Sequence, residues 1–224
     1  MFVKICCIKS VAEARLAISA GASAIGLVSK MPSGPGVISE DLIADIAAAI
    51  PSNVASFLLT SRQTANAIIE QHHRCKTTAI QLVDTVSQDE LCTLRQALPV
   101  VKLVQVIHVV DAASISAAQV IAPFVDALLF DSGQPNAAVN TLGGTGRIHD
   151  WALSRKICDA LQVPVFLAGG ISAHNVAQAV AAVSPFGVDL CSSVRTDDVL
   201  DEGKLRAFFA AVRQLSFSAS GRHF

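Results

Sequence analysis

The sequence has no excess of charge of either sign. Its 224 residues include 17 lysines and arginines and 18 aspartates and glutamates, for a formal net charge of -1. Only 16% of the residues are charged and 52% are hydrophobic, which excludes a disordered protein, because such chains are strongly charged and poor in large aliphatic residues. Without a basic excess to neutralise phosphates, we expect no nucleic-acid partner.

The spacings typical of metal and disulfide sites are also missing. Cys6 and Cys7 are adjacent, and none of the six cysteines forms a CxxC motif, so neither a zinc nor a redox motif is predicted. The six histidines share no metal-ligand spacing, and we expect no metal. The chain opens with no basic and apolar leader, and no apolar run reaches the about 18 residues of a membrane span. These absences predict a reduced, cytoplasmic protein with no membrane partner.

Short β-branched segments alternate with alanine-rich helical segments along almost the whole chain. The expected strands are Phe2–Cys6, Ala24–Val28, Val54–Leu59, Ala79–Val83, Val100–Ile107, Ala127–Phe130, Val163–Leu167 and Gly187–Leu190. The expected helices are Val11–Ala20, Glu40–Ile50, Gln63–Arg74, Gln88–Leu98, Ala112–Ala122, Asp150–Leu161, Ala173–Val183 and Glu202–Leu215. Such alternation implies parallel strands joined by right-handed crossovers.

The predicted fold is therefore α/β, a single (β/α)8 TIM barrel over residues 1–215 with a flexible tail at 216–224. An open doubly wound sheet is the alternative. Against it, the first βα turn, Cys6-Cys7-Ile8-Lys9-Ser10, contains no GxGxxG motif. Serines suited to N-capping precede four of the helices: Ser10, Ser39, Ser87 and Ser172. In a barrel, the chemistry lies in the βα loops at the C-terminal ends of the strands.

The first expected strand ends with a thiol near a lysine. Side chains alternate along a strand, so Lys4 and Cys6 share one face, and Val3, Ile5 and Cys7 share the other. The apolar set suits the helix layer, which directs Lys4 and Cys6 into the barrel. A nearby cation favours the thiolate, the basic and nucleophilic form of cysteine. The alternative is a buried, inert cysteine.

Carboxylates stand at two other strand ends. The sixth expected strand runs directly into Asp131, and roughly 18 residues including Gly143-Gly144-Thr145-Gly146 precede the next helix, far more than the usual 2–6 and typical of a functional loop. Asp131 is thus either a turn former or a site carboxylate. Asp189 alternates with Val188 and Leu190, so it should point inward, as either a structural or a catalytic group.

The seventh and eighth strand ends predict a phosphate site. Gly169 and Gly170 follow the seventh strand, and Ser192 and Ser193 follow the eighth. Glycines let backbone amides approach an anion closely, and a helix that begins after Ser172 would add its dipole. The loops after strands seven and eight form the phosphate site common in TIM barrels.

The order and spacing of these motifs, from residue 2 to about residue 210, resemble phosphoribosylanthranilate isomerase. The matching segments are Lys4-Ile5-Cys6, Gly21-Ala22-Ser23-Ala24-Ile25-Gly26-Leu27-Val28, Ile38-Ser39, Ile80-Gln81-Leu82, Leu129-Phe130-Asp131-Ser132, Gly143-Gly144-Thr145-Gly146 with Asp150-Trp151, Ala168-Gly169-Gly170-Ile171 with Asn175-Val176, and Gly187-Val188-Asp189 with Ser192. Together they are specific, although no single one would be.

The resemblance implies a TIM barrel and an Amadori rearrangement of N-(5-phosphoribosyl)anthranilate in tryptophan synthesis, with no cofactor. It implies that Cys6 is the general base and Asp131 the general acid. The residues it places around a small phosphorylated sugar substrate are Lys4, Gly144, Gly146, Gly169, Gly170, Asp189, Ser192 and Ser193. A monomer and a homodimer are both compatible with the sequence.

The sequence departs from the family pattern at four places. Cys7 replaces a glycine, and the Met31–Val37 loop has no arginine where the family carries one. The family's QLHG becomes Gln81-Leu82-Val83-Asp84, and its SSGVE becomes Cys191-Ser192-Ser193-Val194-Arg195, which loses a glycine and adds a cation. Two alternatives follow from these changes. One is a paralogue that isomerises another phosphosugar, and the other is a catalytically silent protein that binds a phosphorylated ligand.

Overall fold

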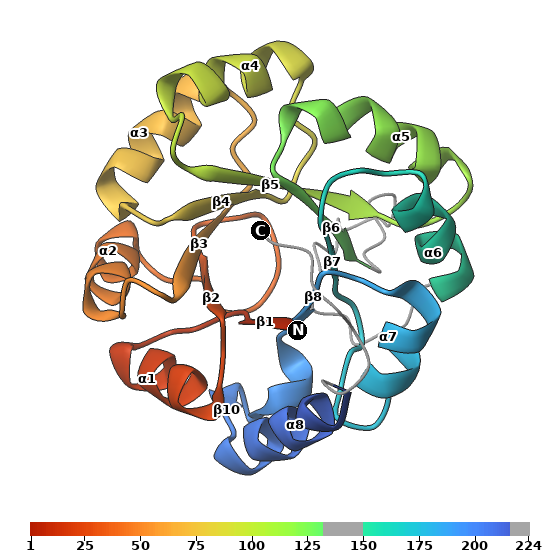
Figure 1. Cartoon of the computed structure of the whole chain (residues 1–224). Helices are drawn as coiled ribbons and strands as arrows, with labels where there is room; N and C mark the ends of the chain where they lie inside the picture. The colour runs from red at the N-terminus through yellow and green to blue at the C-terminus, as the bar shows by residue number, and fades with distance from the viewer. Residues whose placement is uncertain (132–149, 216–224) are drawn as a thin grey trace.

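The computed structural model describes residues 1–131 and 150–215, which form a closed barrel of parallel strands inside a ring of helices (Figure 1). The barrel strands, each paired with the next and β8 with β1, are β1 (Phe2–Ile5), β2 (Ala24–Val28), β3 (Ala55–Thr60), β4 (Ala79–Leu82), β5 (Lys102–His108), β6 (Ala127–Asp131), β7 (Val165–Leu167) and β8 (Gly187–Leu190). The α-helices are α1 (Val11–Ala20), α2 (Glu40–Ala49), α3 (Ala65–Cys75), α4 (Gln88–Ala97), α5 (Ala113–Ile121), α6 (Trp151–Asp159), α7 (Val176–Val183) and α8 (Glu202–Leu215).

This closed barrel confirms the predicted fold class and excludes the open sheet. Short elements that the sequence pattern did not predict are the 3₁₀ turns η1 (Ala122–Phe124) and η2 (Ser192–Val194) and a small hairpin of β9 (Arg195–Thr196) and β10 (Val199–Leu200). Gly144, Gly146 and the 216–224 tail lie outside the described residues. Within the described ranges, no helix combines the length and the apolar character that crossing a membrane requires.

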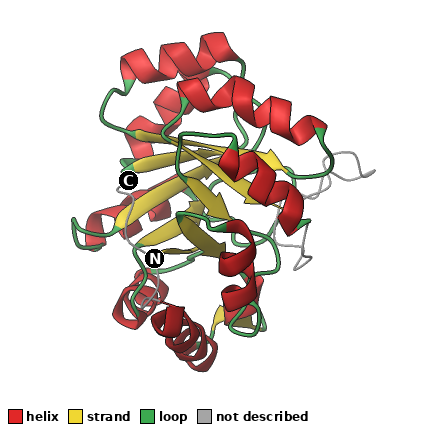
Figure 2. Ribbon diagram, turned by 45° about the vertical axis from the view of Figure 1, so that its right-hand side comes forward, coloured by secondary structure: helices red, strands yellow, loops and turns green. Residues whose placement is uncertain are grey.

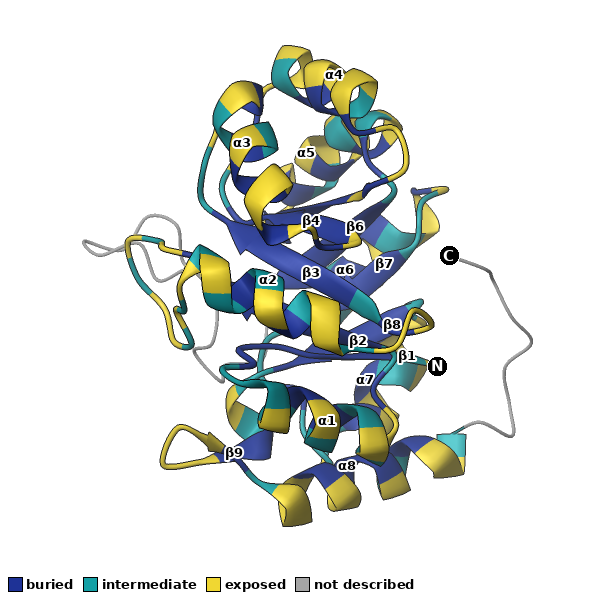
Figure 3. Ribbon diagram, turned by 90° about the vertical axis from the view of Figure 1, so that its left-hand side faces the viewer, coloured by how far each residue is buried: buried dark blue, intermediate teal, exposed yellow. Residues whose placement is uncertain are grey.

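Strand alternation divides the barrel into two apolar layers. Residues such as Ile5, Leu128 and Phe130 pack outward against the helices, whereas Phe57, Leu129 and others fill the interior. In Figure 2 the strands lie inside the helices, and in Figure 3 the strands are buried while the helices expose their outer faces. The two-residue period of the strands therefore decides which side chains reach the interior.

Three of the four expected serine caps are confirmed. Ser10, Ser39 and Ser87 each accept a hydrogen bond from a backbone amide in the first turn of the following helix. The expected cap at Ser172 is wrong, because α7 begins three residues later than predicted, at Val176. Asn175 accepts from the Ser172 amide and donates to the Gly170 carbonyl, each at 2.8 Å, and so its side chain closes the β7–α7 loop.

A buried ion pair joins α1 to the loop after β8. Arg195 Nη1 lies 3.0 Å from Glu13 Oε1, and the two side chains are only 5% and 13% exposed. Glu13 also accepts from the Lys9 and Leu200 amides, and Arg195 donates to the Cys7 carbonyl. Burial alone would raise the pKa of Glu13, but these hydrogen bonds hold it below its usual value. The pair therefore links the loop after β1 to the loop after β8.

Replacing Glu13 with alanine should destabilise the protein by about 3 kcal/mol at neutral pH, because it leaves the buried Arg195 guanidinium without its counter-charge. The loss should shrink as the pH falls through the folded-state pKa of Glu13, where the wild-type carboxyl also loses its charge. Urea denaturation at several pH values measures both effects. Asp159→Ala, which breaks an exposed pair with Arg155, is the control and should cost much less. Equal losses for the two variants would contradict the assignment.

Candidate active site

The barrel interior is built in layers along the strands. Its floor is aromatic, with Phe166 in edge contact with Phe2 and Phe57 at ring-centroid distances of 5.4 and 6.2 Å. Above it lies one buried ion pair, Lys4 with Asp189. Above the pair is the mouth, where a cleft opens to solvent. Because the strands are parallel, their C-terminal ends all meet at this mouth.

Lys4 and Asp189 face each other directly across the β1–β8 pairing. Lys4 Nζ lies 2.7 Å from Asp189 Oδ2, and their side chains are 0% and 7% exposed. Nζ also lies 5.4 Å from the centre of the Phe57 ring, a cation–π distance. Burial alone would lower the pKa of Lys4, but the charge of Asp189 outweighs it and raises that pKa. Lys4 is thus held in its charged form, and the prediction that both residues point inward is confirmed.

Cys6 lies one pleat above Lys4 at the mouth and is 6% exposed. A hydrogen bond from the Cys7 thiol lowers the pKa of Cys6, burial acts against this, and the charge of Lys4 lowers the pKa further. The pKa of Cys7 is raised well above its usual value by its contacts with Cys191 and Cys6. Of these two adjacent thiols, Cys6 is therefore the one that favours the thiolate.

The prediction that Cys7 faces the helix layer is wrong. Strand β1 ends at Ile5, and Cys7 has a φ of 61°, so the alternation of strand side chains no longer applies to it. Its side chain instead packs in the interior cluster and lines the cleft. Its Sγ lies 3.6 Å from the Pro35 carbonyl oxygen and 2.7 Å from Cys191 Sγ.

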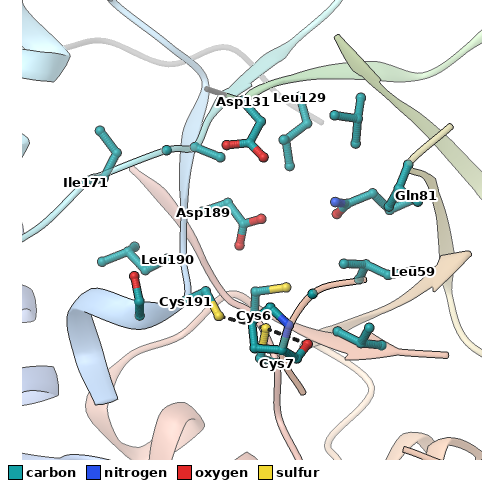
Figure 4. Close-up of a pocket in the computed structure, with 18 of the residues that line it drawn as sticks. Cys6, Cys7, Leu59, Gln81, Leu129, Asp131, Ile171, Asp189, Leu190 and Cys191 are labelled. Atoms are coloured by element: carbon teal, nitrogen blue, oxygen red, sulfur yellow. Dashed lines mark hydrogen bonds between the residues drawn. The ribbon is translucent and has the colours of Figure 1, made fainter. Parts of the chain in front are cut away.

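Asp131 ends β6 and lines the same cleft, 7% exposed. It shares its strand face with Ala127 and Leu129, which lie in the interior cluster. Figure 4 shows its carboxyl group near that of Asp189, with Cys6 beyond. Burial raises the pKa of Asp189, Lys4 acts against this, and the negative charge of Asp131 raises it further. The two carboxylates are thus close enough to interact.

The predicted phosphate residues also meet at this cleft. Gly169 and Gly170 line one side, with φ of 78° and 67°, in the left-handed region that favours glycine. Ser192 and Ser193 line the cleft from η2. Arg195, which the sequence pattern placed as an added cation in this loop, instead turns away to Glu13 and does not line the cleft.

Two polar residues of the cleft escaped the sequence analysis as site residues. Gln81 from β4 and His108 from β5 both line it. Strand alternation could have indicated that Gln81 points inward, because it lies between the outward-facing Ile80 and Leu82. In the described part of the chain, the buried atoms Gln81 Oε1, His108 Nδ1, Asp189 Oδ1 and Ser193 Oγ have no hydrogen-bond partner. Buried polar atoms are normally paired, so this cleft is suited to a polar ligand.

No metal-binding group of three His, Cys, Asp or Glu occurs within residues 1–131 and 150–215.

Comparison with known proteins shows to which family this chain belongs. The family model described as N-(5'phosphoribosyl)anthranilate (PRA) isomerase matches residues 3–211. The chain belongs to the PRA isomerase family. Among its relatives, N-(5'-phosphoribosyl)anthranilate isomerase 2 of Methanosarcina mazei is 33% identical over 225 residues, covering 96% of this chain and 99% of its own. The isomerase of Halorubrum lacusprofundi is 36% identical over 210 residues, covering 93% and 94%.

Solved structures of PRA isomerases share the fold. The enzyme from Thermus thermophilus superposes with a TM-score of 0.81 at 26% identity, covering 96% of this chain and all of that one. A PRA isomerase solved in complex with reduced 1-(o-carboxyphenylamino)-1-deoxyribulose 5-phosphate superposes with a TM-score of 0.77 at 22% identity, covering 96% and 99%. The resemblance noted from the sequence motifs is thus confirmed at the level of family and fold.

Gly26 of β2 keeps this PRA isomerase site compact, and Gly26→Ala tests it. A Cβ at residue 26 would lie 2.8 Å from Cys6 Sγ and 3.1 Å from Lys4 Nζ, so one of the two must shift. Separating the sulfur from the ammonium should raise the pKa of Cys6 and slow its alkylation by iodoacetamide at pH 7 by about an order of magnitude. Peptide mass mapping follows the modification of Cys6 separately from the other thiols.

Gly203→Ala is the matched control. Gly203 lies in α8, where a Cβ would meet only Asp201 Oδ1 at 3.3 Å, and alanine favours the helix. This variant should leave the alkylation rate of Cys6 unchanged. A Gly26→Ala protein whose Cys6 reacts at the wild-type rate would show that the spacing around the thiol is unimportant.

Proposed function

We propose that Cys6 and Asp131 are the general base and the general acid with which this family member isomerises N-(5'-phosphoribosyl)anthranilate to the 1-deoxyribulose 5-phosphate derivative. The observation that carries the proposal is the placement of a thiol and a carboxyl group at one barrel mouth, above the Lys4–Asp189 pair. The reaction needs two proton transfers, and a thiol and a carboxyl group are both able to perform such a transfer.

The chemistry assigns each group its step. Opening the furanose ring requires a proton on the ring oxygen, which a protonated Asp131 supplies. The iminium that results acidifies the hydrogen on the sugar C2, and the Cys6 thiolate removes it. The resulting enol then tautomerises to the ketose: the C2 hydroxyl loses its proton and C1 gains one. Each of these acid–base contributions is typically worth roughly 10²–10⁴-fold in rate.

The Lys4–Asp189 pair supports both roles. The positive charge of Lys4 lowers the pKa of Cys6 and so favours the thiolate that would act as the base. Two carboxylates in proximity repel each other, and Lys4 compensates the charge on Asp189. Because Asp189 is engaged with Lys4, we assign the proton-donating role to Asp131.

The substrate's phosphate would lie against the two loops after β7 and β8. Gly169 and Gly170 offer backbone amides in a conformation with no Cβ in the way, and Asn175 holds their loop through the Gly170 carbonyl. The unpartnered hydroxyl of Ser193 lies at the same cleft. Among the described residues that line this part of the cleft, the donors are neutral, because Arg195 is engaged with Glu13.

The aromatic half of the substrate would meet Met31, Gly34 and Pro35, which line the opposite wall of the cleft. That loop contributes no arginine, and among the described residues of the cleft Gln81 offers a neutral donor to a carboxylate on the ring. This feature favours a second candidate, an isomerase for another phosphosugar amine. Turnover of N-(5'-phosphoribosyl)anthranilate measured by its fluorescence separates the two. A cytoplasmic location and a monomer or homodimer remain predictions.

Removing either proton-transfer group should abolish most of the activity. Cys6→Ser and Asp131→Asn should each lower kcat by roughly 10²–10⁴-fold with a much smaller change in KM, because they remove proton transfer and keep the shape of the site. Cys92→Ser, at an exposed thiol on α4, is the control and should keep full activity. Near-wild-type turnover in Cys6→Ser would eliminate Cys6 as the base, and a wild-type protein without turnover would favour the silent binding protein.

The pH dependence should report the contact between the two adjacent thiols. A hydrogen bond from Cys7 lowers the pKa of Cys6, so the loss of this donor in Cys7→Gly should raise that pKa. The ascending limb of kcat/KM against pH should therefore move to higher pH, while activity at high pH is retained. Glycine accepts the backbone conformation at residue 7. A limb that stays in place would show that Cys7 does not influence the base.

A further inference from the structure

Two thiols that transfer no proton in the proposed isomerisation lie in contact at the mouth of the barrel. Cys7 follows β1 and Cys191 follows β8, and β1 and β8 are paired strands. The Cys191 thiol donates to Cys7 Sγ at a sulfur–sulfur distance of 2.7 Å. Both are free thiols that line the cleft, and Cys191 is the more exposed. Figure 4 shows the two sulfur atoms directed toward each other.

The backbone at residue 7 brings this contact about. Cys7 has a φ of 61°, in the left-handed region where a side chain is disfavoured. Gly36 packs against it so closely that a Cβ there would lie 2.6 Å from Cys7 Cβ. The fold thus holds a side chain in a disfavoured conformation that points it at a second thiol. A strained residue of this kind suggests a function.

We propose that Cys7 and Cys191 form a reversible disulfide when the protein meets a small-molecule disulfide such as oxidised glutathione. The Cys191 thiolate, after losing its proton to solvent, attacks one sulfur of glutathione disulfide and releases glutathione thiolate. The Cys7 thiol then loses its proton and attacks the Cys191 sulfur, which releases the second glutathione thiolate. The two protons end on the two glutathiones, the two cysteines are oxidised, and glutathione disulfide is reduced.

The bond requires little movement. A disulfide needs sulfur atoms about 2.05 Å apart, and the two sulfurs already lie 2.7 Å apart. The link would join residues 184 positions apart in the sequence, at the point where the first and last strands close the barrel. Because such a long loop is closed, the oxidised protein should unfold at a higher temperature than the reduced protein.

Oxidation would also act on the reaction, a consequence that rests on the proposed role of Cys6. In the reduced protein, Cys7 donates a hydrogen bond that favours the Cys6 thiolate. A Cys7 sulfur bound to Cys191 has no proton to donate. Activity at neutral pH should therefore fall on oxidation and return on reduction, which makes this thiol pair a redox-sensitive site beside the catalytic base.

Peptide mapping tests the bond itself without reference to activity. The full-length protein is treated with oxidised glutathione, digested without reduction and analysed by mass spectrometry. We expect a peptide pair that contains Cys7 and Cys191, is lighter by two hydrogens and separates with dithiothreitol. The link should persist in Cys6→Ser, Cys92→Ala and Cys158→Ala and disappear in Cys7→Gly and Cys191→Ala. A stable glutathione adduct without the link, or a link that survives in Cys7→Gly, would overturn the proposal.

Activity and melting temperature test the consequence. Oxidised wild-type protein should lose kcat/KM at pH 7 by about ten-fold, regain it with dithiothreitol, and melt at a higher temperature than the reduced form. Cys191→Ala should change in neither respect when it is treated in the same way. A mapped link with unchanged activity would overturn the regulatory effect alone. A wild-type protein that forms the link but shows no turnover in either state would overturn the proposed function and leave the disulfide site standing.

Discussion

The buried ion pair between Lys4 and Asp189 is the interaction on which the rest of the site depends. It lies inside the barrel, at 2.7 Å, between side chains on the first and last strands. Removing two charges from water costs several kcal/mol per ion, and only close geometry with further partners offsets that cost. Here the pairing of β1 with β8 supplies the geometry, and the Phe57 ring adds a second contact for the ammonium group. The pair can therefore exist only when the barrel is closed.

The pair also organises the electrostatics of the mouth. Lys4 lowers the pKa of Cys6 above it, and Asp189 interacts with Asp131 beside it. An aromatic floor below keeps the pair away from solvent, and the absence of a Cβ at Gly26 leaves room for Cys6 and Lys4 side by side. One buried pair thus influences two neighbouring groups, the Cys6 thiol and the Asp131 carboxyl group. Cys7 and Cys191 come together at the edge of the same mouth.

Local regularity explains which features the sequence could predict. The alternation of strands and helices indicated the barrel, and the two-residue period of a strand placed Lys4 and Asp189 inside it. The errors occur where that regularity stops. Cys7 lies beyond the end of β1 in a left-handed conformation, and α7 begins at Val176 because Asn175, not Ser172, closes the preceding loop. The sequence showed Arg195 only as an added cation in the last loop, and Glu13, 182 positions away, binds it.

The sequence by itself determined the fold class, the family motifs and the strand ends that carry Cys6, Asp131 and the glycine pair, because these depend on local periodicity and short spacings. Only the tertiary structure decided which charges are paired, which thiols touch and which polar atoms face the cleft without a partner. The physical reason is that ion pairing, hydrogen bonding and sulfur contacts act over a few ångströms. Residues such as Cys7 and Cys191 come within that range only when the last strand pairs with the first.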